Sequence, residues 1–338
     1  MNRDQVRWGV LGTGLIARAH VIDALKGADR CDLVAIASRS EETARTVATE
    51  HGIPEAHGSY EQLLAAPHID CVYLPLPNHL HEPWIHQAIA AGKHVLCEKP
   101  LTLTSEQAAN VARHAAERGV IVMEAFMYRF HPAWKMAHSL IAGGAIGRLT
   151  DVSVWFSFRS TRPTDYRHEA ATGGGALYDV GCYAVDVSRT LLGDDPHRVL
   201  GTARMEAGVD MTFSGILDYG DAFATFTCSM DQEPQHSVVI HGTGGWISIA
   251  DPFNCPPDHE TTVAVGTGGH HHPHDSSVVT HSIEAANQYG LQATALGDAI
   301  RNGTPSPLPL EDSVANMRLL ERLFAAADIE LPVPEIEA

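Results

Sequence analysis

Residues 6–17 read VRWGVLGTGLIA, and this stretch decides the fold. The apolar run over 6–11 predicts a strand, and the apolar residues that follow at helical spacing predict a helix directly after it. Between them, Gly12 permits a tight turn, Gly14 lets backbone approach a pyrophosphate, and Ala17 lets helix and strand pack closely. Because amides at a helix N-terminus attract anions, this G-x-G-x-x-A pattern favours a dinucleotide-binding turn over an ordinary glycine turn.

The rhythm of the chain divides it into two main parts. Strand and helix patterns alternate as far as about residue 124, which predicts a doubly wound parallel sheet of the α/β class. Beyond residue 126, strand patterns follow one another with few helices, which indicates a large, mostly antiparallel sheet in an α+β domain. We therefore predict a dinucleotide-binding Rossmann domain at 1–123, an α+β substrate and oligomerisation domain at 124–302, and a C-terminal segment at 303–338 whose helix could pack back on the first domain.

Composition and charge exclude several classes of protein. The 338 residues are 44% hydrophobic and 19% charged, as in a soluble globular chain, and the net charge of -18 repels nucleic acids and anionic lipid surfaces. The six cysteines form no C-x-x-C pair and are expected to be reduced. Neither a signal peptide nor a membrane span is visible, so we expect a cytoplasmic protein. The histidines of the Gly- and His-rich stretch 266–274 have no acidic or cysteine partners at ligand spacing, so we expect a loop there and no metal: His270, His271, His272 and His274.

The end of the predicted second strand bears on the choice of cofactor. A fold specific for NAD usually carries an acidic residue there, which binds the ribose 2′-hydroxyl. Here the strand ends with Ser38 and Arg39, and a hydroxyl and a guanidinium suit a 2′-phosphate. NADP is therefore the expected cofactor, with NAD also possible. The alternatives are that Arg39 is a solvated loop cation and that Glu41 or Glu42 binds the ribose.

Three further strings complete the pattern: PNHLH at 77–81, EKP at 98–100 and GGGALYDVGCY at 173–183. Together with the phosphate turn they resemble the glucose-fructose oxidoreductase / inositol dehydrogenase (Gfo/Idh/MocA) family of NAD(P)-dependent oxidoreductases, over about residues 6–320. The resemblance implies that 98–100 forms a turn, often with a cis proline, that aims Lys99 at the nicotinamide and the substrate hydroxyl.

Asp179 and Tyr183 correspond to the Asp-x-Gly-x-His element of that family, with tyrosine in place of histidine. This departure, and the string EAFMYRFHP at 124–132, resemble the subgroup of dimeric dihydrodiol dehydrogenases and NADP-linked D-xylose dehydrogenases. Some sugar-nucleotide ketoreductases also carry tyrosine at this place, which leaves the substrate open.

The residue types suit hydride transfer between nicotinamide C4 and a carbinol carbon, because such a transfer needs a group that handles the hydroxyl proton. A free phenol has a pKa of about 10, and a nearby ammonium lowers it. We therefore expect Lys99 and Tyr183 to act as the proton-handling pair, and Asp179 to bond a second substrate hydroxyl. The alternatives are that Tyr183 is a packed ring, Lys99 a solvated cation and Asp179 a surface or capping carboxylate.

The predicted function is that of an NADP-dependent oxidoreductase acting on a sugar or cyclic polyol, for example an aldose such as D-xylose or glucose giving its lactone, or a related diol or keto-sugar. The alternative is a catalytically silent NADP-binding regulator or scaffold of the same fold. An open sheet face in the second domain would favour a homodimer or homotetramer.

Two groups of residues are assigned to this function, and local packing is the alternative for Asn78, His81 and the wall residues. The pocket wall is expected to include Arg129, Phe158 and Tyr166 beside Asp179. The cofactor side is expected to comprise Gly12, Thr13, Gly14, Leu15, Ile16, Ser38, Arg39, Pro77, Asn78, His81, Glu98 and Lys99.

Overall fold

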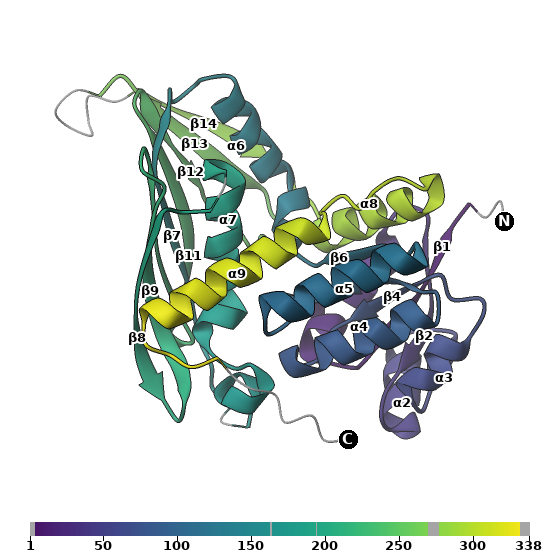
Figure 1. The fold of residues 1–338 in the computed structure, drawn as a ribbon. Helices are drawn as coiled ribbons and strands as arrows, with labels where there is room; N and C mark the ends of the chain where they lie inside the picture. Colours follow the sequence, from purple (N-terminus) through teal and green to yellow (C-terminus); the bar gives the residue numbers. More distant parts are fainter. Residues whose placement is uncertain (1–3, 163, 194, 270–276, 332–338) are drawn as a thin grey trace. The chain divides into compact units, whose positions relative to one another are not determined.

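The computed structural model describes residues 4–162, 164–193, 195–269 and 277–331 (Figure 1). By contact the chain divides into two compact units: unit 1 comprises Met1–Phe126 and Tyr289–Met317, and unit 2 comprises Met127–Gln288 and Arg318–Ala338. Helix α8, which the sequence assigned to the second domain, therefore groups almost entirely with unit 1. The predicted domain boundaries stay predictions.

Unit 1 contains a six-stranded sheet in the order β3-β2-β1-β4-β5-β6, and every neighbouring pair is parallel. This confirms the predicted doubly wound parallel sheet. Because all strands run in one direction, the loops that follow them emerge at the same edge. The strands are β1 (Val6–Leu11), β2 (Cys31–Ala37), β3 (Glu55–His57), β4 (Cys71–Leu74), β5 (His94–Cys97) and β6 (Val122–Glu124).

The helices of unit 1 begin and end where local chemistry dictates. In the capping box of α5, the side chain of Thr104 accepts from the amide of Gln107, whose own side chain accepts from Thr104, and Gly119 ends the helix at a φ of 65°. The helical segments that lie wholly or almost wholly in unit 1 are η1 (Ala17–Val21), α1 (Ile22–Gly27), α2 (Glu41–His51), α3 (Tyr60–Ala65), η2 (Asn78–Leu80), α4 (His81–Ala90), α5 (Ser105–Arg118) and α8 (Gln288–Asn302).

Unit 2 contains an eight-stranded sheet in the order β14-β13-β12-β11-β7-β10-β9-β8. Its pairs are antiparallel except for β7 with β10, which confirms the predicted, mostly antiparallel sheet. The strands are β7 (Leu149–Arg159), β8 (Arg198–Glu206), β9 (Val209–Asp218), β10 (Phe223–Ser229), β11 (Asp231–Gly242), β12 (Gly245–Ile249), β13 (Thr261–Thr267) and β14 (Ser277–Ile283).

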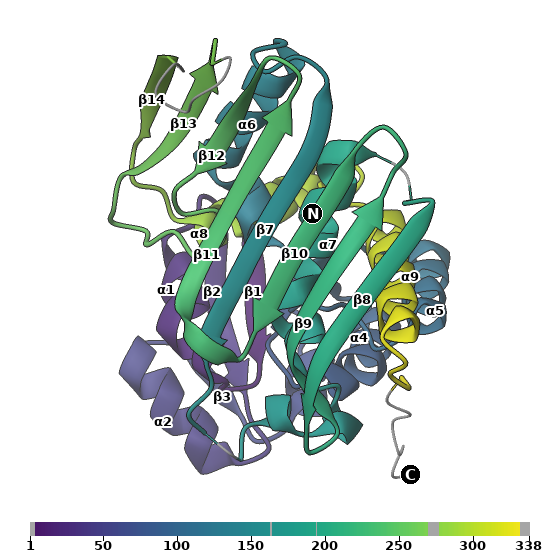
Figure 2. The same ribbon diagram turned by 90° about the vertical axis from the view of Figure 1, so that its left-hand side faces the viewer.

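Helices α6 and α7 pack on one face of this sheet, and among the described residues no helix covers the opposite face (Figure 2). That outer face carries paired hydroxyls, such as Ser214 with Thr227 at 2.8 Å, beside exposed apolar side chains including Trp155 and Ile216. The helical segments of unit 2 are η3 (Met127–Phe130), α6 (Pro132–Ala142), η4 (Tyr166–His168), η5 (Ala170–Thr172), η6 (Leu177–Gly181) and α7 (Cys182–Leu192), and the division between the units falls within α9 (Leu310–Ala326).

The apolar interiors of both units include the cysteines. All six are buried and none forms a disulfide: Cys31, Cys71, Cys97, Cys182, Cys228 and Cys255. Burial raises the pKa of the Cys31 thiol to about 11, and those of Cys71, Cys97 and Cys228 rise for the same reason. Within the described ranges, no helix has both the length and the apolar character needed to cross a membrane.

Candidate functional site

The glycine turn after β1 has the geometry that an approaching pyrophosphate requires. Gly12 has a φ of +124°, which side chains rarely tolerate, and a Cβ at Gly14 would lie 3.1 Å from the carbonyl oxygen of Pro75. The amide of Gly12 donates to the carbonyl of Ala37 at 2.9 Å, which ties the turn to the end of β2. Ala17 is fully buried behind the turn, as its predicted packing role requires. The residues of this turn therefore fit a dinucleotide.

The helix after this turn passes through the π-helical segment η1, which the sequence pattern did not predict. Within η1, His20 stacks on Tyr289 at the start of α8, with ring centroids 5.5 Å apart and planes inclined by 15°. Tyr289 had not been predicted as a site residue either, because it lies about 270 residues further along the chain and belongs to none of the motifs.

The loop after β2 presents the groups expected to recognise a 2′-phosphate. The amide of Ser38 donates to the carbonyl of His57 at 3.1 Å, and this fixes the loop against the end of β3. Arg39 is exposed, and its charge acts on the phenol of Tyr60 in α3. Ser40 caps α2, since its hydroxyl accepts from the amide of Thr43 at 3.3 Å.

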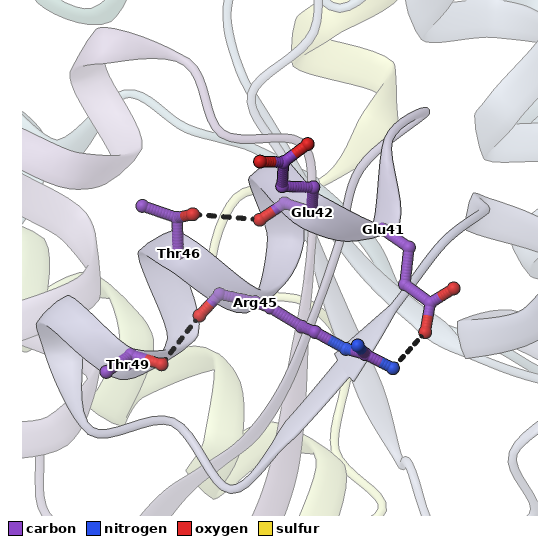
Figure 3. A pocket seen from close by; sticks show the side chains of 5 residues that line it. All are labelled: Glu41, Glu42, Arg45, Thr46 and Thr49. Carbon is purple, nitrogen blue, oxygen red and sulfur yellow. Dashed lines mark hydrogen bonds and ion pairs between the residues drawn. The ribbon is translucent and has the colours of Figure 1, made fainter.

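Glu41 and Glu42, the alternative ribose acids, lie in the first turn of α2 and line an open pocket of about 640 Å³ (Figure 3). Glu41 forms an ion pair with Arg45 one turn further along. All five lining residues belong to this one helix, so the pocket is a concavity along an exposed helix face: Glu41, Glu42, Arg45, Thr46 and Thr49. It gathers no groups from the ends of other strands, and we assign it no function.

His81 joins the loops that follow β4 and β5. Its ring is fully buried, with Nδ1 2.8 Å from the carbonyl oxygen of Pro100 and Nε2 2.8 Å from that of Leu76. Burial lowers the pKa of His81 to about 4, although the two carbonyl oxygens favour the protonated ring. Both nitrogens are committed to backbone, so this ring supports the loops rather than offering a nitrogen to a cofactor. Asn78, just before it, is also buried.

The Glu98-Lys99-Pro100 turn follows β5 at the same edge of the sheet. The Lys99–Pro100 peptide is cis, as the resemblance implies. The carboxylate of Glu98 accepts from the hydroxyl of Tyr73 in β4 at 2.7 Å, and the charges of Glu98 and Lys99 both act on the phenol of Tyr289. Tyr73 was not predicted as a site residue, because an apolar run gives no sign that one ring ends at a polar edge.

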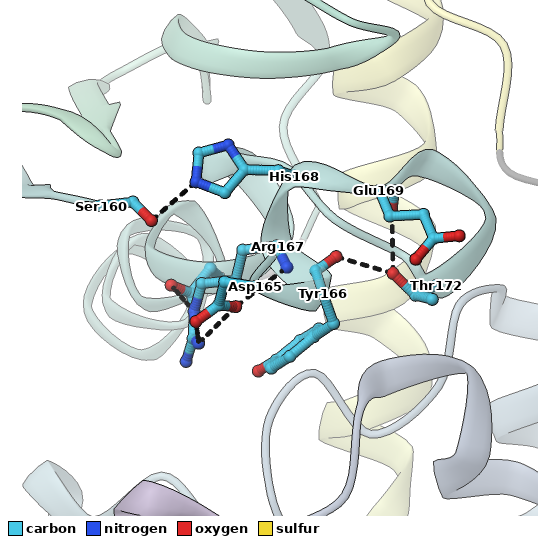
Figure 4. A network of polar contacts seen from close by, with 8 residues as sticks. Ser160, Asp165, Tyr166, Arg167, His168, Glu169 and Thr172 are labelled. Atoms are coloured by element: carbon cyan, nitrogen blue, oxygen red, sulfur yellow. Dashed lines mark hydrogen bonds and ion pairs between the residues drawn. The ribbon is translucent and has the colours of Figure 1, made fainter. Parts of the chain in front are cut away.

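In unit 2, Asp179 joins a polar network on the segment before α7 through Arg167. Figure 4 shows Arg167 in that network beside Asp165 and Tyr166. The carboxylate of Asp179 accepts from Nε of Arg167 at 2.7 Å, and the same guanidinium reaches Asp165 at 3.1 Å and lies 4.7 Å from the ring centroid of Tyr166. The neighbouring carboxylate of Asp179 raises the pKa of Arg167. Asp179 is 6% exposed, so this ion pair is largely withdrawn from water. Arg167 was not predicted, because it lies outside the recognised motifs and meets Asp179 only in the folded chain.

Tyr183 lies in α7 within an aromatic cluster of unit 2. Its ring centroid is 5.3 Å from that of Phe156 and 5.1 Å from that of Phe253, and its hydroxyl lies 3.5 Å from the sulfur of Met127. The ring is 4% exposed, so the cluster fixes its direction by packing. Phe158, expected in the pocket wall, is half-buried on the adjoining strand β7.

A second buried acid lies one turn after Tyr183. Asp186 is 1% exposed, and its carboxylate accepts from the hydroxyl of Tyr128 and lies 3.5 Å from Nη1 of Arg129. Arg129, expected in the pocket wall, therefore pairs with this helix. Asp186 was not predicted, because a single acid inside a helical pattern gives no signal of burial.

The predicted site residues fall into both units. The whole cofactor-side set lies in unit 1, and the set assigned to substrate lies in unit 2, where Tyr166 joins Asp179 through Arg167. Lys99 and Tyr183 belong to different units, so their pairing stays a prediction. His270, His271, His272 and His274 lie outside the described residues. Within the ranges that are described, no three metal-ligating side chains form a group that could hold a metal ion.

Comparison with known protein families accounts for both units. Residues 6–126 match the model described as "Oxidoreductase family, NAD-binding Rossmann fold", and residues 134–248 match the "GFO/IDH/MocA C-terminal domain". The two matches follow the same order as the sequence motifs.

Individual relatives cover almost the whole chain. A D-xylose 1-dehydrogenase (NADP(+)) of Haloferax volcanii is 38% identical over 95% of this chain and 97% of its own length. A trans-1,2-dihydrobenzene-1,2-diol dehydrogenase of Macaca fascicularis is 30% identical over 97% of this chain and 98% of its own. The crystal structure of the 3-ketoreductase KijD10 of Actinomadura kijaniata, in complex with NADP and TDP-benzene, has a TM-score of 0.88 at 29% identity, over 96% of this chain and 98% of that one.

Proposed function

The chain belongs to the GFO/IDH/MocA family of oxidoreductases, and from that premise we propose that it transfers a hydride between NADP and a hydroxyl-bearing carbon of a sugar or cyclic polyol. One observation carries this proposal: the glycine turn after β1 and the Lys99 turn after β5 lie at the same edge of the parallel sheet of unit 1. A dinucleotide held at the turn can extend along this edge. The substrate class is supported by the names of two relatives, a D-xylose 1-dehydrogenase and a dihydrobenzene-diol dehydrogenase, and by the 3-ketoreductase KijD10, which was crystallised with NADP and TDP-benzene.

The preference for NADP rests on the loop after β2. That loop places a buried serine and an exposed arginine, Ser38 and Arg39, where an NAD-specific fold carries an acid. The guanidinium of Arg39 can pair with a 2′-phosphate. Its positive charge also acts on the phenol of Tyr60 and favours the ionised form of that phenol. The D-xylose dehydrogenase and KijD10 are both named with NADP, which supports the same choice.

When bound, the nicotinamide supplies or accepts the hydride, and the protein must handle the hydroxyl proton. We assign that proton to the phenol of Tyr183 and assign Lys99 to polarise the substrate oxygen and stabilise the phenolate. Asp179, which already accepts a hydrogen bond from Arg167, would accept another from a second hydroxyl of the substrate. Packing against Phe156 and Phe253 directs the Tyr183 ring, and the Tyr73–Glu98 hydrogen bond holds the residue before Lys99.

The test is a spectrophotometric panel of aldoses, cyclic polyols and diols with NADP and with NAD. On the best substrate, we expect Tyr183→Phe and Lys99→Met each to lower kcat by about a hundredfold or more, since general acid–base groups contribute about 10²–10⁴-fold. Both variants should still bind NADP in a fluorescence titration. Tyr219→Phe and Lys135→Met, which alter a phenol and an ammonium outside the site, are the matched controls.

Full rates in both site variants would refute the assigned mechanism. Tight NADP binding with no turnover by the unmodified protein across the panel would refute the enzymatic proposal and favour a cofactor-binding regulator instead.

We also propose that the chain forms a homodimer or homotetramer through the outer face of the unit 2 sheet. The exposed Trp155 and Ile216 lie on that face among paired hydroxyls, and no described helix covers it. A second copy presenting the same face would bury both sets of apolar side chains.

A further inference from the structure

Asp210 is a buried acid at the start of the helical segment that carries Asp179 and Tyr183. It lies in β9 and is 2% exposed. Its Oδ2 accepts a hydrogen bond from the amide of Leu177, the first residue of η6, at 2.7 Å, and its carboxylate also accepts from the amide of Ala176. The acid therefore satisfies amides that have no partner within the helix, from a strand more than 30 residues further along the chain.

The glycine run at 173–175 is fitted to this contact. Gly175 has a φ of +113°, and a Cβ on it would overlap Oδ1 of Asp210. A Cβ on Gly174 would overlap the carbonyl oxygen of Arg167, and the amide of Gly175 donates to that same carbonyl at 3.0 Å. The glycine run therefore packs directly against the carboxylate of Asp210 at Gly175 and against the backbone of Arg167 at Gly174, with no space for a side chain at either position.

Asp210 faces the N-terminal amides of η6 as a hydrogen-bond acceptor. The helix dipole and these amides favour its ionised form, but burial opposes ionisation more strongly and raises the pKa of Asp210 to about 7. Asp210 also acts electrostatically on the phenol of Tyr178 in η6 and on the thiol of Cys228 in β10, and burial raises the pKa of both groups, so both are neutral near pH 7. The carboxylate interacts mainly with backbone amides, and so it fixes the backbone of the first turn.

We propose that Asp210 is a positioning residue: by holding the first turn of η6, it sets the direction in which Asp179 and Tyr183 leave the helix. Asp179 lies two residues after Leu177, and Tyr183 lies six residues after it. A rotation of the first turn would therefore move both side chains together. The catalytic consequence rests on the proposed function, whereas the structural consequence does not.

The experiment compares Asp210→Ala and Asp210→Asn with the control Asp218→Asn. Asp218 lies in the same strand, where it pairs with Arg198 at 3.5 Å and accepts from the amide of Gly220, away from the helix. Hydrogen exchange is followed by mass spectrometry over 176–183, and kcat and KM are measured at a temperature well below unfolding.

We expect Asp210→Ala to speed exchange over 176–183, to lower kcat by about ten- to a hundredfold, as small displacements of catalytic groups do, and to leave the Kd for NADP unchanged. Asparagine keeps one acceptor oxygen, so Asp210→Asn should recover part of both effects, and Asp218→Asn should show neither.

Unchanged exchange over 176–183 in Asp210→Ala, or an unchanged kcat with faster exchange, would overturn the proposal. Should Asp210→Ala fail to fold, Asp210→Asn decides in the same way, through a fall in kcat of several-fold or its absence. If the unmodified protein turns over no substrate, the proposed function fails, and the exchange measurement still decides whether Asp210 holds the helix.

A double-mutant cycle adds a direct test of the contact. Gly175→Ala introduces the Cβ that meets Oδ1 of Asp210, so its effect on exchange over 176–183 should shrink when residue 210 is alanine. Additive effects of the two substitutions would contradict the proposed contact.

Discussion

His81 illustrates how a residue from a recognised motif can act through the backbone. Its two ring nitrogens lie 2.8 Å from the carbonyl oxygens of Pro100 and Leu76, so one side chain links the two loops that follow β4 and β5. Because Lys99 directly precedes Pro100, this link also holds the backbone from which the Lys99 ammonium extends. The PNHLH string indicated a functional loop. The link between the loops could not be predicted from it, because the link depends on Pro100, 19 positions away from His81.

Burial lowers the pKa of His81 to about 4, so the neutral ring carries one N–H and donates to one carbonyl group near pH 7. Replacing His81 with phenylalanine should leave that buried carbonyl group without its donor. We expect His81→Phe to lower the free energy of unfolding by about 1–3 kcal/mol, the usual cost of an unsatisfied buried polar group, and to raise the Kd for NADP. Urea unfolding and fluorescence titration measure the two effects. The half-exposed His68 provides the control variant His68→Phe, and equal losses in both variants would contradict the role given to His81.

Arg39 should set the choice between the two cofactors. We expect Arg39→Glu to weaken NADP binding by about ten- to a hundredfold while weakening NAD binding far less, because a hydrogen bond to a charged group contributes about 1.5–3 kcal/mol. Titration with both nucleotides measures the ratio. Arg45→Glu, on the outer face of α2, makes the same charge change and should leave the ratio unaltered; an equal shift there would mean that net charge, and not Arg39 itself, governs the preference.

At the scale of elements, the helices that bear the site depart from regular geometry at their first turns. Both the helix after the glycine turn and the one that carries Asp179 pass through a π-helical segment, η1 and η6. Such segments are common at functional sites. Apolar spacing predicts that a helix is present but says little about one widened turn within it, and so neither segment was predicted.

Asp210 should give the stability of the protein a characteristic pH dependence. Burial raises its pKa from 3.8 to about 7, so the folded protein holds this proton more tightly than the unfolded chain does. Its contribution to stability is therefore greatest below about pH 4, is lost progressively as the pH rises to about 7, and is constant above that. We expect the difference in unfolding free energy between the unmodified protein and Asp210→Asn to fall over this window, as measured by urea unfolding at several pH values. A difference that stays level, or that grows with pH, would show that the carboxyl group titrates elsewhere.

At the scale of the whole molecule, the open sheet face of unit 2 leads to a prediction about assembly. Two glutamates, introduced as Trp155→Glu and Ile216→Glu, should lower the mass of the assembly in light scattering, because like charges would then face each other across the interface. Arg113→Glu, at an exposed position in α5 of unit 1, provides the control. An unmodified protein that is already a monomer at micromolar concentration would refute the proposed assembly.

The two sheets and the family could be predicted from the sequence because short-range patterns in the chain indicate them. Strand–helix alternation, the glycine turn and the EKP string each lie within a few neighbouring residues, and each indicates its own structure. Arg167, Asp186, Asp210 and Tyr289 were missed because each acquires its role from a partner on another element. These contacts form only when the chain folds. In the sequence, each of the four residues is therefore indistinguishable from any other acid, base or aromatic ring.

The burial of all six sulfurs makes the native chain a poor target for alkylating reagents. Iodoacetamide or a maleimide can react only when a local or global opening admits it, so the rate at which each position is labelled reports how often that part of the protein opens. Cys71 and Cys97 lie on the central strands of unit 1 and Cys228 lies in the sheet of unit 2, so a time course resolved by mass spectrometry would time the two halves separately. The native cysteines thus serve as probes of local opening, and no additional cysteine has to be engineered into the protein.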